Sequence, residues 1–284
     1  MPALYGRKVE LVVSAPNAPP LVKAAWNDTP GVDLSGLDID FSVERTLKPE
    51  PNNASIRVYN LSDATRKAVS GAKTLNVSLA AGYQSGVEQI YFGQVRAAWT
   101  ERQGPDFITH FESGDGEQAK LARLNTGVGG RVPIGTALSM IVQALGLGPG
   151  NVAKVQSALA KTGVTAINGG ALTGNASRRM TDFCRSAGLE WSIQNGVIQI
   201  LEQGSLLSPS AVLVSTATGM IESPTVDSKG IVTATMLITQ GLVPGCLVSI
   251  DSLFFQGGYR VQRCRWQAST GGTEWNVTLD GKKY

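Results

Sequence analysis

The chain has 284 residues, of which 42% are hydrophobic, so it is long enough for two domains with sizeable cores. Its 25 basic and 22 acidic residues give a net charge of only +3, which argues against binding to nucleic acid or to an anionic membrane through charge. No apolar run reaches the roughly 18 residues of a membrane-spanning helix, and the 33 glycines and 13 prolines are typical of turn-rich β architecture.

The first residues, MPALYGRKVELVV, lack the apolar core and cleavage site of a signal peptide. The three cysteines, Cys184, Cys246 and Cys264, are odd in number and show no CxxC spacing. Free cysteine is among the most buried residue types, so we interpret all three as small buried hydrophobes. These features together predict a protein made in a cytosol.

Residues 1–115 predict a β-rich domain. Strands are expected at these segments: Lys8–Val13, Leu37–Val43, residues 53–60, Thr74–Tyr83, Gln89–Thr100 and Phe107–Glu112. Residues 14–35 are rich in Pro, Asn and Gly and predict a long loop, and Ser62 predicts the N-cap of a short helix that ends near Val69. Six strands with short connections favour a closed or nearly closed barrel, because closure removes exposed strand edges.

Residues 116–204 change to a helical pattern. Apolar residues at helical spacing predict helices over Pro133–Leu147 and Asn175–Ala187, and Asn151–Leu159 is a candidate third helix. The glycine-rich segment Thr162–Gly174 is interpreted as a loop.

A sharp hairpin follows the helices. Asn195-Gly196 favours a type I′ turn because both residues accept positive φ, and this turn would pair Ile193 with Ile198. It would also pair Trp191 with Ile200, so four apolar side chains share one face. The helices and this hairpin predict a small α+β insert.

Residues 205–284 predict an antiparallel meander. Turn sequences separate four strand-like segments: Ile231–Ile238, Cys246–Asp251, Tyr259–Trp266 and Glu274–Leu279. In the last segment Trp275, Val277 and Leu279 alternate with polar residues, which indicates one buried and one solvated face. The predicted fold class is therefore mainly β, with two barrels, residues 1–115 and 205–284, and the α+β insert, residues 116–204, between them.

No group of side chains predicts a reaction centre, so we expect no catalytic, cofactor-binding or metal-ligating residues. His110, the only histidine, lies in a predicted strand without a paired nucleophile and is interpreted as a structural residue. Glu112, Asp115 and Glu117 lie in a glycine-rich turn but lack the spacing of a calcium loop. Paired glycosidase carboxylates are the alternative, and a solvated turn between domains is favoured.

The remaining motifs also lack a specific chemistry. Gly127–Gly130 and Gly146–Gly150 match neither the dinucleotide-binding nor the P-loop pattern, and the pair Arg178-Arg179 predicts a solvated helix face. Three tryptophans lie on predicted strands: Trp191, Trp266 and Trp275. Their alternation with polar residues favours core packing over stacking on a sugar. An interaction protein is therefore favoured over an enzyme.

The C-terminal block resembles the barrel of bacteriophage baseplate hub proteins, which lie at the base of long contractile tails. Four segments carry the resemblance by their order and spacing: Gly219–Pro224 (GMIESP), Val243–Gly245 (VPG), Gly257–Trp266 (GGYRVQRCRW) and Thr273–Leu279 (TEWNVTL). The resemblance extends more loosely to residues 1–115.

The resemblance implies tail-tube-like barrels and a trimeric hub ring that joins the tail tube to the central spike. It implies these partners: further copies of this chain, the tail tube protein, the central spike protein, and tape measure and wedge proteins. DNA would only pass through the open centre, and no membrane, cofactor or catalysis is implied. The protein would be part of the virion tail baseplate after assembly in the host cytoplasm.

Two alternatives stay open. One is the needle base of a related bacterial injection device, a secretion system or a pyocin-like particle, in which a spike would follow in the same chain, whereas this sequence stops at Tyr284. The other is a tail-associated cell-wall hydrolase, which needs a paired acid or a Cys/His site that the sequence does not show.

Overall fold

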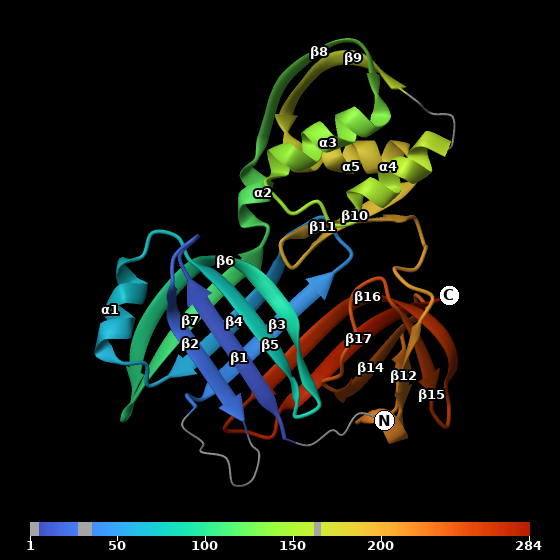
Figure 1. Ribbon diagram of the computed structural model, residues 1–284. Helices are drawn as coiled ribbons and strands as arrows, with labels where there is room; N and C mark the ends of the chain where they lie inside the picture. The colour runs from blue at the N-terminus through green and yellow to red at the C-terminus, as the bar shows by residue number, and fades with distance from the viewer. Residues whose placement is uncertain (1–5, 28–35, 162–165) are drawn as a thin grey trace. The chain divides into compact units, whose positions relative to one another are not determined.

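The computed structural model describes residues 6–27, 36–161 and 166–284, which divide into two units (Figure 1). Unit 1 comprises Met1–Thr46, Asn52–Gly114 and Leu206–Tyr284, and unit 2 comprises Leu47–Pro51 and Asp115–Ser205. The prediction of a mainly β fold with a small α+β insert is confirmed. None of the described helices is long and apolar enough to cross a membrane.

The N-terminal part of unit 1 follows the predicted strands, with one addition. Its elements are β1 (Lys8–Ser14), β2 (Pro20–Asn27), β3 (Ile39–Thr46), β4 (Asn52–Tyr59), α1 (Asp63–Gly71), β5 (Asn76–Tyr83), β6 (Gly86–Gln103) and β7 (Asp106–Asp115). The Ser62 hydroxyl accepts a hydrogen bond from the Thr65 N–H at 3.1 Å, so the predicted N-cap is confirmed.

The predicted loop over residues 14–35 is wrong for its middle part, because β2 pairs there with β1. Val22 and Ala24 are buried while Lys23 and Ala25 are exposed, which is the alternation of a half-buried strand. Pro20 is tolerated because it is the first residue of a strand at the end of the sheet. Residues 28–35 of the predicted loop lie outside the described residues.

The C-terminal part of unit 1 contains the four predicted strands and two short ones that the sequence did not indicate. Its elements are β12 (Ala211–Ser215), η1 (Thr216–Thr218), β13 (Thr225–Val226), β14 (Ile231–Leu237), β15 (Leu247–Asp251), β16 (Gln256–Ser269) and β17 (Trp275–Lys283). β12 pairs in parallel with β15, and after η1 the chain turns to β14, where the Ile221 N–H donates to the Thr235 carbonyl at 2.9 Å. The segment after η1 therefore lies beside β14, although β12, the strand before it, pairs with β15.

The two β-rich blocks share one sheet and one core. Within the described residues the strand order is β13-β14-β17-β16-β3-β4-β7-β6-β5-β1-β2, so the blocks meet where β16 pairs with β3 (Figure 1). The Phe41 ring of the first block meets the Trp275 ring of the second edge-on, with centroids 6.5 Å apart. Trp266 and Trp275 are each 1% exposed, so the prediction that they pack in the core is confirmed.

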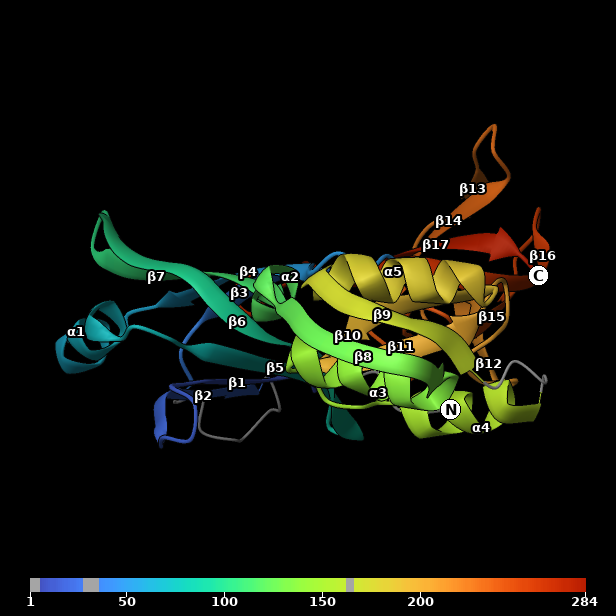
Figure 2. The ribbon, with the colours of Figure 1, turned by 90° about the horizontal axis from the view of Figure 1, so that it is seen from above.

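Unit 2 contains the three predicted helices. Its elements are α2 (Glu117–Leu121), β8 (Arg123–Pro133), α3 (Ile134–Leu145), α4 (Val152–Lys161), β9 (Ala166–Asn175), α5 (Ala176–Ser186), β10 (Leu189–Gln194) and β11 (Val197–Glu202). Figure 2 shows β8 and β9 running side by side along this unit. The predicted loop Thr162–Gly174 is wrong from residue 166 onward, because β9 pairs there with β8; residues 162–165 lie outside the described residues.

The predicted hairpin of unit 2 is confirmed in turn type and register. Asn195 and Gly196 have φ values of 55° and 78°, and Ile193 pairs with Ile198 and Trp191 with Ile200. All four apolar side chains are buried in the core of unit 2.

The interpretation of the acidic turn as solvated is wrong for Asp115, which is only 1% exposed. Its carboxylate accepts hydrogen bonds from the N–H groups of Asn195, at 2.6 Å, and Gly196, at 2.8 Å. Two backbone donors offset the cost of burying the charge. Asp115 therefore holds the hairpin turn of unit 2, a role that no local pattern indicates because its partners lie 80 residues away.

Candidate functional site

One polar feature of unit 1 extends across the outward face of five neighbouring strands from both blocks: β14, β17, β16, β3 and β4. In each of these strands the alternate residues are buried, as Cys264 and Trp266 are in β16. The side chains between them point the other way. We call this set the polar face: Thr233, Thr235, Thr278, Asp280, Arg263, Arg265, Gln267, Asp40, Ser42, Glu44, Ser55 and Arg57.

The strand register aligns the polar side chains in rows across the sheet. In one row Thr235 lies opposite Thr278, Thr278 opposite Arg265 and Arg265 opposite Glu44. The Thr235 and Thr278 hydroxyls are 3.2 Å apart, and the Arg265 guanidinium donates to a Glu44 carboxylate oxygen at 3.0 Å. Cross-strand pairs of this kind stabilise a sheet and fix its register.

A second row lies two residues along the strands. The Arg263 Nε donates to Asp280 at 2.7 Å, and the Thr233 hydroxyl donates to the same carboxylate at 3.0 Å. A longer contact of 3.8 Å joins Arg263 to Glu44. The two rows therefore form one network that crosses the β16–β3 boundary between the blocks.

Asp40 anchors the end of the polar face on β3. Its carboxylate meets the Arg57 guanidinium at 3.0 Å and accepts a hydrogen bond from the Tyr59 hydroxyl at 2.8 Å. Burial of the phenol and this hydrogen bond to Asp40 raise the pKa of Tyr59. Beside it lies a pocket of about 350 Å³, which Ser42, His110 and other polar residues line.

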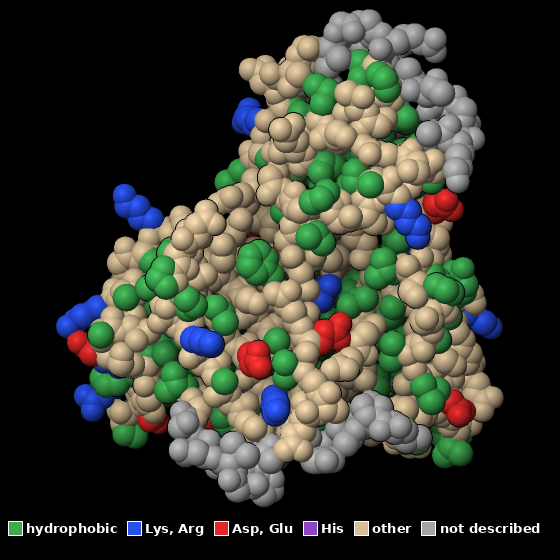
Figure 3. All heavy atoms as spheres, in the orientation of Figure 1, with side chains coloured by type: hydrophobic (Ala, Val, Ile, Leu, Met, Phe, Trp, Pro, Cys, Tyr) green, Lys and Arg blue, Asp and Glu red, His purple; other side chains and the backbone are tan. Residues whose placement is uncertain are grey.

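The three arginines of the polar face each lie beside a carboxylate, so its ion pairs join opposite charges. The exposed Lys282 continues the same side of β17 beyond Asp280 and adds one positive charge at its margin. Figure 3 shows acidic and basic side chains interspersed on the side of the molecule that faces the viewer. No group of three or more potential metal ligands occurs in the described part of the chain.

His110 lies at the margin of this face and is partly buried, as predicted. Its Nε2 lies 3.1 Å from a Glu101 carboxylate oxygen, and its ring stacks on Trp99 with centroids 4.7 Å apart. Glu112 lies on the same strand as His110 and Glu117 begins α2, both half-buried, so the three acids of the predicted turn are not brought together into one site.

The other residues that the sequence singled out are structural. The three cysteines are free and buried as predicted, and burial raises the pKa of the Cys184 thiol to about 12. Trp191 is 3% exposed, which confirms core packing, and Arg178 and Arg179 are exposed as expected. Gly148 belongs to a turn that pairs with Val197.

Sequence reasoning missed the polar face as a site. Its signal was visible in the alternation of polar residues along Asp38–Glu44 and Glu274–Asp280. Alternation shows that a strand has a solvated face but not which strands are neighbours, so the junction of β16 with β3 could not be read from it.

Comparison with known proteins was made on the sequence and on the fold. The family model described as baseplate hub gp41 matches residues 27–280. A search of curated protein sequences returns no significant match.

Several solved structures share the fold at low sequence identity. A tail protein from Neisseria meningitidis MC58 superposes with a TM-score of 0.61 at 9% identity, over 98% of this chain and 97% of that chain. The 43 kDa tail protein of prophage MuSo2 from Shewanella oneidensis gives 0.62 at 8% identity, over 96% of each chain. A component of the type VI secretion system of E. coli gives 0.56 at 9% identity, over 90% of this chain and 76% of that one.

Proposed function

The chain belongs to the baseplate hub gp41 family, and we propose that three copies of it form a ring that joins the tail tube to the central spike. The family match covers most of the chain and identifies a structural component of a phage tail hub. The trimer, the neighbours and the open channel are the proposed part. The observation that carries them is the union of two β-rich blocks in one sheet with one polar face.

Symmetry supports a trimer. A ring of three chains that each supply two similar barrels offers six barrels, which matches a tail tube with six subunits in each ring. We propose that residues 1–115 and 205–284 act as these two tube-like barrels, related by about 60° around the ring axis. Unit 2 would then be an insert outside the barrels.

The polar face supports a channel for DNA. A surface that binds DNA carries excess Lys and Arg, whose contacts with phosphates release counterions. The polar face instead pairs each of its arginines with a carboxylate, so it would let DNA slide without holding it. We propose that this face lines the channel of the ring.

The protein would work without catalysis. The favoured role is assembly and transmission of force, with the tail tube protein and the central spike protein as partners, and tape measure and wedge proteins beyond them. A zymogram on peptidoglycan tests the rival role of a tail-associated hydrolase. Turnover that a single substitution abolishes would overturn the non-enzymatic proposal.

A second candidate function is the needle base of a bacterial injection device. The structural similarity to a type VI secretion component favours it, although at this identity the similarity concerns the fold alone. Mass spectrometry of purified phage particles separates the two roles, because a hub subunit is retained in virions.

Electron microscopy of the purified protein tests the main proposal. We expect a three-fold ring built from three 29.9 kDa chains, with two barrels in each chain and the polar face toward the centre. A ring of six copies, or a channel lined by another surface, would overturn it.

A further inference from the structure

The tip of the β15–β16 hairpin exposes two large apolar side chains. Leu253 is 94% exposed and Phe254 is 79% exposed, which are the highest values among the large hydrophobic residues described. Hairpin tips favour Gly, Asn and Asp, so a Leu-Phe pair contradicts ordinary turn chemistry. Leu253 and Phe254 depart from this turn preference and are not buried in their own fold. Such departures are expected at functional surfaces.

The tip is held in a defined shape. The Ser252 N–H and hydroxyl both donate to the Phe255 carbonyl, at 2.9 and 3.1 Å, and the Phe255 N–H donates to the Ser252 hydroxyl at 3.1 Å. The Gln256 amide also donates to the Asp251 carboxylate at 3.1 Å. We call Leu253 and Phe254 the apolar knob. These hydrogen bonds fix the backbone beneath it, so docking mainly costs the freedom of the two side chains.

Unit 1 also has a recess of about 250 Å³ between α1 and β6. Val69 and Ala98 line it with apolar surface, and Trp99, which is 44% exposed, borders it. We call this the α1–β6 recess. Exposed tryptophan in a hollow is typical of the centre of protein interfaces.

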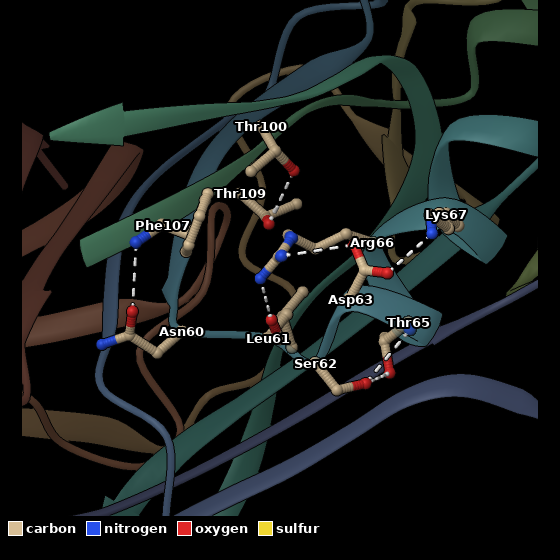
Figure 4. A network of polar contacts seen from close by, with 10 residues as sticks. All are labelled: Asn60, Leu61, Ser62, Asp63, Thr65, Arg66, Lys67, Thr100, Phe107 and Thr109. Atoms are coloured by element: carbon tan, nitrogen blue, oxygen red, sulfur yellow. Dashed lines mark hydrogen bonds and ion pairs between the residues drawn. The ribbon is translucent and has the colours of Figure 1, made fainter. Parts of the chain in front are cut away.

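The walls of the α1–β6 recess are fixed by polar contacts around α1 (Figure 4). The Arg66 guanidinium donates to the Leu61 carbonyl at 2.5 Å and lies 4.0 Å from the centroid of the Phe107 ring. The Thr100 and Thr109 hydroxyls, 2.9 Å apart, tie β6 to β7 beside it. The recess is therefore preformed.

We propose that the apolar knob of one copy docks into the α1–β6 recess of the next copy and so closes the ring. This inference rests on the proposed trimer. A three-fold ring needs a heterologous contact, in which one patch of a chain meets a different patch of its neighbour. The two patches are distinct surfaces, because α1 and β15 lie at opposite ends of unit 1 in both views (Figure 1 and Figure 2). Closure after three copies further requires that each docked copy is turned by about 120° from the one before.

Charge around the two patches is complementary. Asp251 is exposed at the base of the knob, whereas Arg66 and Lys67 both line the recess and share one carboxylate, Asp63, which Lys67 meets at 2.7 Å. The recess therefore keeps one excess positive charge. An acidic flank on the knob and a basic flank on the recess favour this pairing over contact of like patches.

The test measures the mass of the purified 284-residue chain across a range of concentrations. The double variant Leu253→Ser/Phe254→Ser should raise the dissociation constant of the trimer at least tenfold while its melting temperature stays close to that of the wild type. Ser70→Trp, which fills the recess from its exposed rim, should have the same effect. Ser228→Trp, at the exposed tip between β13 and β14, is the matched control and should remain trimeric.

A charge exchange gives an independent readout. Asp251→Lys alone and Lys67→Asp alone should each weaken the trimer, and the two together should restore it. A knob variant that stays trimeric with wild-type affinity overturns this inference and leaves the proposed ring intact. If that variant then fails to join the tail, the knob binds another tail protein. A wild-type chain that forms no trimer at any concentration overturns the proposed ring and the docking together.

Discussion

Unit 1 and unit 2 differ in the sequence distance over which their cores are assembled. In unit 1 the junction strands β3 and β16 are more than 200 residues apart, as the Glu44–Arg265 contact illustrates. In unit 2 the paired strands β10 and β11 are consecutive, and a two-residue turn joins them. Unit 1 therefore depends on closing loops of more than 200 residues before its core forms, whereas the Asp115–Asn195 contact that holds the hairpin of unit 2 spans only 80 residues.

This contrast predicts that the two units respond separately to substitutions. Damage to the junction of β3 and β16 should unfold unit 1 and spare unit 2, and damage to the hairpin turn should do the reverse. Amide hydrogen exchange on the full-length chain reads both units at once.

The largest expected effect is that of Phe41→Asp. Phe41 is 4% exposed and meets Trp275, so losing the buried ring costs roughly 3–5 kcal/mol before the cost of burying a carboxylate. We expect loss of exchange protection in β3, β16 and β17, with protection of β10 and β11 retained. Ser42→Asp, one residue along on the polar face, is the matched control and should fold. Soluble Phe41→Asp protein with full protection would show that the contrast between the units is wrong.

A smaller effect is expected from Asp115→Ala. The substitution leaves the N–H groups of Asn195 and Gly196 without the buried carboxylate, and lost bonds to a charged group cost roughly 3 kcal/mol. Exchange protection should fall in β10 and β11 and remain in β16. Glu202→Ala removes an exposed acid from the same hairpin and should have little effect. Equal loss of protection in both units would mean that Asp115 couples their stabilities, and the expectation that the units respond separately would be wrong.

Asn195→Val should act on the same turn more weakly. Valine resists the positive φ that Asn195 adopts, at a cost of about 1–2 kcal/mol. Asn195→Gly removes the side chain without this steric penalty and serves as the control. The difference in stability between the two variants is measured as the denaturant midpoint of unit 2, followed by amide exchange. An unchanged midpoint for the valine variant would contradict the steric cost assigned to positive φ at position 195.

Features set by near neighbours in the chain could be predicted from the sequence, and features set by distant partners could not. The hairpin register, the Ser62 N-cap and the buried faces of β3 and β17 followed from local patterns, because turn chemistry and alternation act between near neighbours. β2 was missed because Pro20 and the nearby glycines and asparagines resemble a loop, and β9 because its glycines hide a strand pattern. The polar face and the role of Asp115 depend on partners that only the tertiary fold brings together.

The smallest expected change in stability concerns the polar face. Glu44 and Arg265 are 36% and 39% exposed in their side chains, and ion pairs that water reaches contribute about 0.2–1 kcal/mol. Glu44→Gln should therefore shift the unfolding midpoint only slightly.

Reversal of charge on this face should nevertheless change its behaviour toward DNA. Glu44→Lys/Asp280→Lys leaves Arg263 and Arg265 without their carboxylates, so each chain gains a cluster of positive charge at the β16–β3 junction. If the polar face lines a channel, three copies concentrate these charges around one lumen, and DNA should bind with an affinity that falls steeply as salt rises. Glu10→Lys/Glu101→Lys makes the same change in net charge on β1 and β6, outside the junction strands, and should bind more weakly, with a shallower dependence on salt. Equal binding by the two variants would show that net charge alone sets the affinity for DNA. The proposal that the paired charges of the polar face let DNA pass would then be wrong.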